Sequence, residues 1–265
     1  ERGVGIMSAT RSFRLGYSII GWGGTPDLDE ALGAIKEAGW EGAEFTGVSL
    51  EWLGTPKYLK SVFDRYELPL ACIFGGLRLE DDKVHIEKMR RRIEFAAEMG
   101  CEIFCLLGAP RVHQRLPTGD EFKRLADQAE LFIEYAEPFG LTVAYHAHPR
   151  CTVESEEEQD KLLSYTDRLK VCVDASVAAL MGEDACAQLR KYRDRLGYVH
   201  MKDWARGKFC EMGKGTVGLD FAAFRETLEE IGYDGWVMGE LSTYADTDAT
   251  ESCYVNRKYL ASVGY

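Results

Sequence analysis

The chain has 265 residues, of which 46% are hydrophobic and 29% charged. This composition is ordinary for a globular protein with a sizeable core, and it excludes an intrinsically disordered chain. The formal net charge of −12 repels a polyanionic backbone, so we expect no nucleic-acid partner. No apolar run reaches the roughly eighteen residues that span a bilayer, and no apolar signal-peptide core is present, which predicts no membrane partner and a cytoplasmic location.

Eight cysteines are scattered along the chain without any C-x-x-C pair. Several lie in apolar, strand-like runs, where a free cysteine behaves as a small hydrophobe, so we expect reduced thiols. Residues 1–6, which precede Met7, are interpreted as an expression-vector remnant and set aside.

Short apolar runs alternate with longer amphipathic segments from residue 13 to the end. The apolar runs predict eight strands, over residues 13–20, 42–45, 69–74, 103–107, 141–145, 170–173, 198–201 and 236–239. Between them, apolar positions three or four residues apart predict helices, for example over residues 28–38, 86–99, 122–139 and 221–231.

Residues that start and stop helices support these boundaries. A left-handed glycine suits the position just after a helix, and four predicted helices are followed by Gly39, Gly100, Gly140 and Gly232. Residues that suit an N-cap stand before three helices: Asp27, Thr118 and Asp220. The acidic run over residues 154–160 is interpreted as a helix start rather than a charged tail.

Eight strand-then-helix units of about 33 residues each match a βα repeat and leave no room for a second domain. We therefore predict an α/β fold, a single (β/α)8 TIM barrel over residues 13–265 behind an N-terminal extension of residues 1–12. The rival is a doubly wound open sheet. It is disfavoured because no G-x-G-x-x-G follows the first strand, and the glycines over residues 21–24 lack that spacing.

Metal-type ligands stand at the ends of four consecutive predicted strands: His146, Asp174, His200 and Glu240. The gaps between them are 28, 26 and 40 residues, each close to one βα unit, so all four are expected at similar height around the barrel mouth. Taken singly, a strand-end carboxylate is usually a helix cap or an ion-pair partner, and a histidine a satisfied polar residue. Two imidazoles with two carboxylates suit Mn²⁺, Co²⁺, Mg²⁺ or Zn²⁺.

The residues around these ligands resemble a known family. The similarity is carried by Tyr-His-Ala-His-Pro-Arg-Cys-Thr-Val-Glu-Ser from Tyr145, Val-Asp at 173–174, His-Met-Lys-Asp from His200 and Gly-Tyr-Asp-Gly-Trp-Val-Met-Gly-Glu from Gly232. These runs resemble the xylose isomerase-like superfamily of sugar isomerases, epimerases and dehydratases, over nearly the whole chain. Together with Leu-Gly-Tyr-Ser-Ile-Ile-Gly-Trp from Leu15, the Tyr-His-x-His and Thr-Val-Glu-Ser elements are most similar to the inosose dehydratase branch.

The resemblance implies a divalent metal, Mn²⁺ first, held by the same four ligands, and the dehydration of a keto-inositol. Two departures from the family pattern bear on the reaction. Most isomerases and epimerases of the superfamily carry Glu where His146 stands and pair it with the Glu that matches Glu240 as opposed acid/base groups. Many members also have a substrate-binding His where this chain has Val177.

The expected chemistry is proton removal next to a ketone. A divalent ion on the carbonyl oxygen stabilises the charge that develops there, and Glu240 or His146 is the expected base. Reprotonation then gives an isomer or epimer, whereas loss of the β-hydroxyl gives dehydration and needs an acid. His148 is the expected acid, since period two places it on the side of His146, and Lys202 is expected to hold a substrate hydroxyl or carbonyl. A surface ion pair is the alternative for Lys202 and Asp203.

Other residues near strand ends are candidates for substrate binding. Glu44 is expected to bind a sugar hydroxyl or to fix a neighbouring histidine, and Arg206 to orient the substrate unless it is a solvated loop arginine. His113, in the loop after the fourth strand, is a weaker candidate because loop positions favour solvent exposure. Three aromatic residues are expected either to form an apolar wall against a sugar ring or only to pack in the barrel: Trp22, Phe74 and Trp204. Gly213 and Gly215 are interpreted as a turn rather than a phosphate loop.

We therefore predict a divalent-metal-dependent lyase that acts on a polyhydroxy carbonyl substrate, a keto-sugar or keto-inositol. The alternatives are a metal-dependent sugar isomerase or epimerase and a non-catalytic carbohydrate-binding barrel, since a fold alone does not establish activity. An abasic-site nuclease is set aside, because five histidines are too few for a multi-zinc cluster and the net charge is −12. A homo-oligomer is compatible with this architecture.

Overall fold

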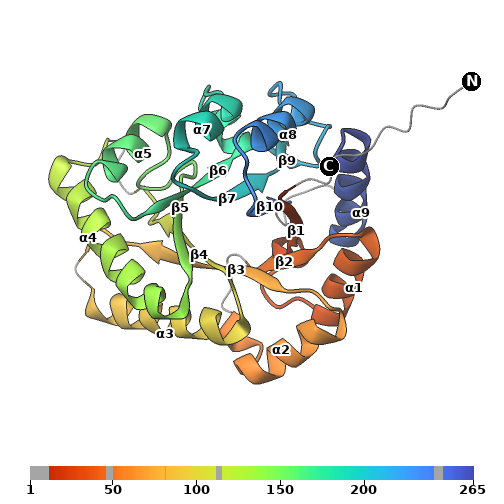
Figure 1. The fold of residues 1–265 in the computed structure, drawn as a ribbon, viewed down its shortest axis with the longest axis horizontal. Helices are drawn as coiled ribbons and strands as arrows, with labels where there is room; N and C mark the ends of the chain where they lie inside the picture. Colours follow the sequence, from red (N-terminus) through yellow and green to blue (C-terminus); the bar gives the residue numbers. More distant parts are fainter. Residues whose placement is uncertain (1–11, 46–49, 81, 112–114, 242–246) are drawn as a thin grey trace, which may run out of the picture.

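Eight parallel strands close into a barrel, which confirms the predicted fold class (Figure 1). The structure is a computed structural model that describes residues 12–45, 50–80, 82–111, 115–241 and 247–265. The strand order around the barrel is β1-β10-β7-β6-β5-β4-β3-β2, and β1 closes the ring on β10 with Arg14 opposite Trp236. The barrel strands are β1 (Arg14–Ser18), β2 (Gly42–Phe45), β3 (Leu70–Leu77), β4 (Ile103–Gly108), β5 (Thr142–His146), β6 (Lys170–Asp174), β7 (Leu196–Met201) and β10 (Trp236–Gly239).

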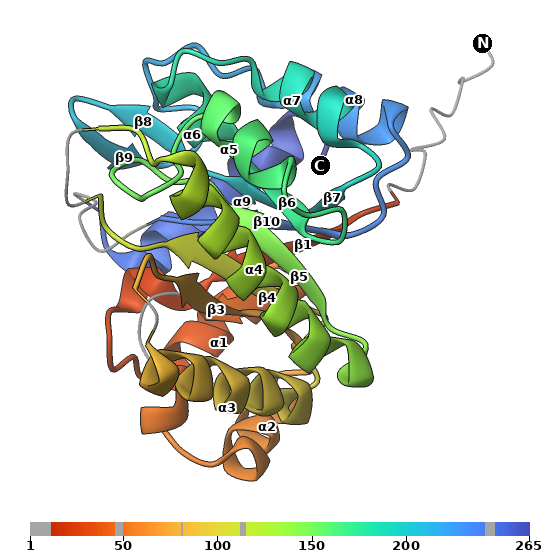
Figure 2. The same ribbon diagram turned by 90° about the vertical axis from the view of Figure 1, so that its left-hand side faces the viewer.

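Helices surround the strands as an outer layer, and α1 lies beside α9, so the two ends of the described chain meet on one flank (Figures 1 and 2). The helices are α1 (Leu28–Ala38), α2 (Pro56–Arg65), α3 (Lys83–Met99), α4 (Gly119–Ala136), α5 (Glu156–Leu163), α6 (Ala175–Leu180), α7 (Ala185–Tyr192), α8 (Phe221–Glu230) and α9 (Ala249–Ser262). Shorter elements are the 3-10 helices η1 (Ile19–Trp22), η2 (Leu50–Trp52) and η3 (Glu137–Phe139) and the hairpin of β8 (Asp203–Ala205) with β9 (Lys208–Cys210).

The predicted helix boundaries follow from local hydrogen bonding. All three predicted N-caps accept from the first turn of their helix, and Thr118 forms a full capping box with Glu121. The four predicted stop glycines all have positive φ, between 70° and 87°. The acidic run does start a helix, because Ser155 caps α5.

Two predicted elements end at least two residues earlier in the structure than the sequence predicts. The first strand ends at Ser18 rather than residue 20, since the Ser18 hydroxyl accepts from the Ile20 amide and starts η1. The helix predicted over residues 122–139 ends as an α-helix at Ala136, and Pro138 falls in the η3 turn that follows.

Apolar side chains fill two layers. The larger layer lies between strands and helices, and the smaller one is formed by inward-facing residues, among them Cys72, Cys105, Cys172 and Trp236. A Cβ on Gly42 would lie 2.5 Å from the Trp236 ring, so glycine lets that ring fill the barrel interior. The barrel is therefore a packed core, and chemistry is confined to its ends.

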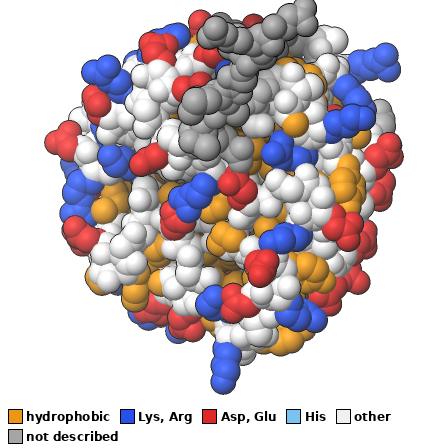
Figure 3. All heavy atoms as spheres, turned by 45° about the vertical axis from the view of Figure 1, so that its right-hand side comes forward, with side chains coloured by type: hydrophobic (Ala, Val, Ile, Leu, Met, Phe, Trp, Pro, Cys, Tyr) orange, Lys and Arg blue, Asp and Glu red, His pale blue; other side chains and the backbone are white. Residues whose placement is uncertain are grey.

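The remaining expectations concern surface and thiols. All eight cysteines are free, and among the described residues no helix is long and apolar enough to cross a membrane. On the face shown in Figure 3, acidic and basic side chains are scattered among one another rather than separated by sign. Of the expected extension, residues 1–11 lie outside the described residues, and the Ser12 hydroxyl donates to the Tyr233 carbonyl.

Candidate metal centre

The four predicted ligands converge at the carboxyl ends of neighbouring strands. His146 ends β5, Asp174 ends β6, His200 lies near the end of β7, and Glu240 directly follows β10. Each offers one ligand atom, and these atoms all lie within 4.8 Å of one another. Every one of the four residues is at most 7% exposed. The strand-end spacing in the sequence thus does bring two imidazoles and two carboxylates to one point.

On one side of the cluster, His146 faces Asp174. His146 Nδ1 lies 2.8 Å from the Ala147 carbonyl, to which it donates, so the Nε2 lone pair points into the cluster at 3.3 Å from Asp174 Oδ2. Asp174 Oδ1 accepts from the Ser176 amide and hydroxyl and from the Val177 amide, which caps α6. The second oxygen, Oδ2, is left for the centre.

On the other side, His200 lies between two carboxylates. Its Nδ1 is 2.9 Å from Glu240 Oε2, and its Nε2 is 2.7 Å from Glu44 Oε2. The Tyr198 hydroxyl donates to the same Glu44 oxygen at 2.6 Å. The prediction that Glu44 fixes a histidine therefore matches its place in the structure, whereas its complete burial leaves no surface for a sugar hydroxyl.

Lys202 lies inside the same cluster, which excludes the alternative of a surface ion pair. Its Nζ is 2.9 Å from Glu240 Oε2 and 3.0 Å from Asp174 Oδ2, and the residue is 1% exposed. The ammonium also lies 4.6 Å from the centre of the Phe209 ring, a cation–π distance. Lys202 therefore binds the same two carboxylate oxygens that face the histidines.

Three observations show that these residues fit a divalent ion. Neighbouring ligands of an ion with bonds of about 2.0–2.2 Å lie roughly 3–3.5 Å apart, and the His–carboxylate contacts here are 2.9 and 3.3 Å. Asp174 Oδ2 is buried and, despite its contact with Lys202, accepts no aligned hydrogen bond. With His146 and His200 neutral, as ligation requires, the buried carboxylates of Asp174, Glu240 and Glu44 outnumber the one ammonium of Lys202 by two charges, which a divalent cation neutralises.

The electrostatics keep the carboxylates ionised. Burial acts to raise the pKa of Asp174 and of Glu240, but the Lys202 ammonium and the histidines overcome it and hold both pKa values well below the ordinary range. Burial, with help from Lys202 and His146, lowers the pKa of His148 to about 4, so this imidazole is neutral at pH 7. A buried carboxylate that stays ionised in this way is a good metal ligand.

His148 and several aromatic rings form the wall beside the centre. The His148 ring lies 5.6 Å from the His146 ring and 6.4 Å from Phe209, between centroids. Phe74 packs on His200 at 5.7 Å between ring centroids, and Trp204 contacts Phe209 at 4.8 Å. Phe209 itself was not predicted, because it belongs to the β8–β9 hairpin that the sequence did not reveal.

Two other predicted residues lie away from the ligands, and a third is not among the described residues. Trp22 packs on Tyr17 at 6.2 Å and donates to the Thr250 hydroxyl at the start of α9. Arg206 is exposed at the tip of the β8–β9 hairpin with φ of 53°, which fits the alternative of a solvated loop arginine. His113 lies outside the described residues.

Asp203 holds the loop beyond the hairpin against the barrel. It is buried, and its Oδ2 accepts from the amides of Gly213 and Gly215, both at 3.0 Å. A Cβ on Gly215 would lie 1.6 Å from Asp203 Oδ1, so only glycine allows this approach. These contacts support the interpretation of the two glycines as a turn. Asp203, the residue after Lys202, fixes this turn.

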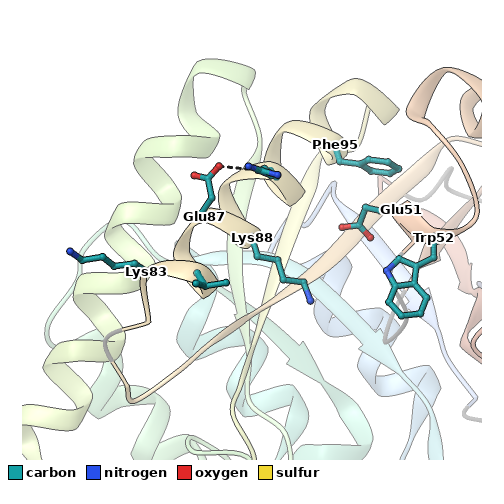
Figure 4. A pocket seen from close by; sticks show the side chains of 8 residues that line it. Glu51, Trp52, Lys83, Glu87, Lys88 and Phe95 are labelled. Carbon is teal, nitrogen blue, oxygen red and sulfur yellow. Dashed lines mark hydrogen bonds and ion pairs between the residues drawn. The ribbon is translucent and has the colours of Figure 1, made fainter.

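A separate hollow of about 610 Å³ lies between η2 and the start of α3 (Figure 4). Trp52 and Val84, 83% and 78% exposed, line it together with charged residues of α3, and none of its described lining residues is a ligand of the centre. The hollow is thus distinct from the candidate metal centre.

The fold and the site together define a barrel with a candidate metal centre at its carboxyl-terminal mouth. The model of the xylose isomerase-like TIM barrel family matches residues 32–256, so the chain belongs to that family. The predicted resemblance is thereby confirmed.

Individual relatives narrow the comparison. Inosose dehydratase of Lacticaseibacillus casei is 28% identical over 272 aligned residues, which cover 86% of this chain and 89% of that protein. Among solved structures, L-ribulose 3-epimerase has a TM-score of 0.81 at 19% identity and covers 95% of this chain and 94% of its own. The IOLI protein with a bound zinc atom has a TM-score of 0.78 at 19% identity and covers 95% of this chain and 98% of its own. These two structural similarities show the fold.

Proposed function

We propose that the protein is a divalent-metal-dependent dehydratase that removes water from a polyhydroxy ketone, a keto-inositol or a keto-sugar. The observation that carries the proposal is the buried cluster of His146, Asp174, His200 and Glu240, all within 4.8 Å, with Lys202 on its two carboxylates. The similarity to inosose dehydratase over most of both chains supports this reaction class.

The donor set also bears on the ion. Two imidazole nitrogens and two carboxylate oxygens suit Mn²⁺ best in our proposal, with Co²⁺, Mg²⁺ and Zn²⁺ as competitors, because carboxylates favour Mn²⁺ and Mg²⁺ while imidazole suits Zn²⁺. The IOLI protein, which shares the fold and binds a zinc atom, supports a divalent ion in this chain and leaves its identity to the donor set.

When bound, the ion supplies Lewis-acid stabilisation of negative charge on the ketone oxygen. The residues of the chain do the rest. Lys202, held between Asp174 and Glu240 and against Phe209, puts a fixed positive charge beside that oxygen. His146 and His200 present lone pairs to the ion because their other nitrogens face the Ala147 carbonyl and Glu44.

Proton transfer falls to His148 in this proposal. Its Nδ1 lies 3.1 Å from the Pro149 carbonyl and donates to it, which leaves Nε2 with the lone pair that a base needs. His148 Nε2 takes the proton α to the ketone, the β carbon–oxygen bond breaks, and the hydroxyl leaves as water after taking a proton from the same imidazolium. Glu240, engaged by His200 and Lys202, serves as a ligand rather than as the base expected from the sequence.

A sugar isomerase or epimerase is the second candidate function, since two epimerases of known structure share the fold of this chain. Two-base epimerisation uses groups on opposite faces of the substrate. Here His146 is a candidate ligand held by the backbone, and His148 lies next to it on the same wall. One proton-transferring side chain on one wall favours elimination over inversion.

Product analysis tests the proposal. The Mn²⁺-loaded protein is incubated with a panel of keto-inositols and keto-sugars, and the products are analysed by ultraviolet absorbance and mass spectrometry. We expect a product lighter by one water, abolished by EDTA and slowed at least about 10²-fold in His148→Gln. A product of unchanged mass would establish the epimerase instead, and metal and ligand binding without turnover would establish the non-catalytic barrel.

A further inference from the structure

We propose that Glu44 is a positioning residue that fixes the ring orientation and tautomer of His200 and thereby sets the affinity of the centre for its divalent ion. This inference rests on the proposed metal centre. It assigns Glu44 to the network behind the ligands, in place of the substrate contact that a strand-end carboxylate suggests.

The contacts place Glu44 and Glu240 on opposite sides of the His200 ring. Glu44 Oε2 lies 2.7 Å from His200 Nε2, while His200 Nδ1 lies 2.9 Å from Glu240 Oε2 on the opposite side of the ring. Tyr198 donates its hydroxyl to the same Glu44 oxygen at 2.6 Å. The three hydrogen-bonded residues, Tyr198, Glu44 and His200, are all fully buried.

The geometry of strands β2 and β7 places Glu44 next to His200. The pairing of β2 with β3 shifts register between Ala43 and Glu44, an irregularity of the kind that re-aims a side chain. Tyr198 and His200 are two residues apart on β7, so both point into the barrel and reach the same carboxylate from one strand.

The tautomer decides whether His200 can bind an ion. With Glu44 accepting from Nε2–H, the Nδ1 lone pair faces the cluster; with the proton on Nδ1, the lone pair would face Glu44 and the ligand would be lost. Carboxylates behind ligating histidines act in this way, and their loss typically costs 10–100-fold in metal affinity. The negative charge of Glu44 adds to the effect, since Glu44 is one of the three buried carboxylates whose excess charge the ion neutralises.

The test is the affinity for Mn²⁺, measured from the free-ion signal in electron paramagnetic resonance, for wild type, Glu44→Gln and Glu102→Gln. Glu102 is the control carboxylate, because it pairs with Arg14 at the opposite end of the barrel, away from the candidate ligands. We expect Glu44→Gln to weaken the dissociation constant about 10–100-fold and Glu102→Gln to leave it unchanged. The visible spectrum of bound Co²⁺ should also change in Glu44→Gln alone, which a purely structural role would not produce.

The outcomes separate the two proposals. Wild type that binds no Mn²⁺ overturns the proposed function, whereas wild type and Glu44→Gln that bind with equal affinity overturn only the role of Glu44. If Glu44→Gln does not fold by circular dichroism, Tyr198→Phe decides, since it keeps the charge and removes one donor. Its affinity should fall by less than about tenfold, below the loss that removing the carboxylate causes; a larger loss would contradict a role through charge and tautomer.

Discussion

Replacing Lys202 with methionine removes the one ammonium that contacts both candidate carboxylate ligands while keeping most of the side-chain volume. Lys202 Nζ lies 3.0 Å from Asp174 Oδ2 and 2.9 Å from Glu240 Oε2, and the residue is 1% exposed. The substitution therefore leaves two buried carboxylates near each other without their shared cation. We expect the metal-free variant to be much less stable than wild type.

The magnitude follows from the burial of the pair. Each contact has a gross Coulomb energy of about 5 kcal/mol at 3 Å and an effective dielectric of about 20, most of which desolvation offsets. Breaking one side of a buried pair typically costs about 3–5 kcal/mol. For a domain of this size about 2–4 °C of melting temperature corresponds to 1 kcal/mol, so we expect a loss of roughly 10 °C.

The assay is thermal unfolding of both proteins in EDTA and in Mn²⁺. Because the ion takes the same oxygens as the ammonium, Mn²⁺ should stabilise Lys202→Met more than wild type and narrow the gap between them. A difference in melting temperature below about 2 °C in EDTA corresponds to about 1 kcal/mol or less at this chain length. Such a small difference would refute the reasoning.

Three further predictions concern parts of the fold around the centre. Burial lowers the pKa of His85, whose Nε2 lies 2.8 Å from a backbone carbonyl of β3. Below pH 6.5 the unfolded chain therefore binds a proton that the folded chain does not, and the free energy of unfolding decreases as the pH is lowered. His85→Gln should make this decrease between about pH 7 and 5 smaller in urea titrations. Gly215→Ala forces a Cβ to 1.6 Å from Asp203 Oδ1, and we expect a loss of at least about 2 kcal/mol by urea unfolding, as overpacking costs; an unchanged midpoint would contradict it. Gly33→Ala, inside α1 with its nearest neighbour at 3.8 Å, should raise the unfolding free energy by about 0.5–1 kcal/mol, and destabilisation would show that the site is not open.

The strand ends were the most predictable part of the site. A parallel barrel brings the carboxyl ends of its strands to one mouth, so four ligands spaced by one βα unit had to meet once the fold was known. The same logic placed His148 beside His146. It also explains why helix caps such as Asp27 and Thr118 were found, since each bonds only to residues two or three positions away.

The network behind the ligands was harder to foresee. Glu44 and Tyr198 are 154 positions apart in the chain, and nothing local in the sequence says that their side chains share a hydrogen bond. The β8–β9 hairpin was missed for a different reason: its turn is Arg206-Gly207, both at positive φ, and arginine is not a residue that signals such a turn. Phe209 and the fixed loop beyond the hairpin were missed with it.

The central claim is that His146, Asp174, His200 and Glu240 hold one divalent ion together. Elemental analysis of protein dialysed against limiting Mn²⁺ tests it most directly, with Asp174→Asn as the variant and Glu102→Gln as the control. The account predicts one ion per chain in wild type and control and a loss of at least about tenfold in affinity in Asp174→Asn, since the anionic ligand oxygen is gone. Equal metal content in all three proteins, or none in wild type, would contradict it.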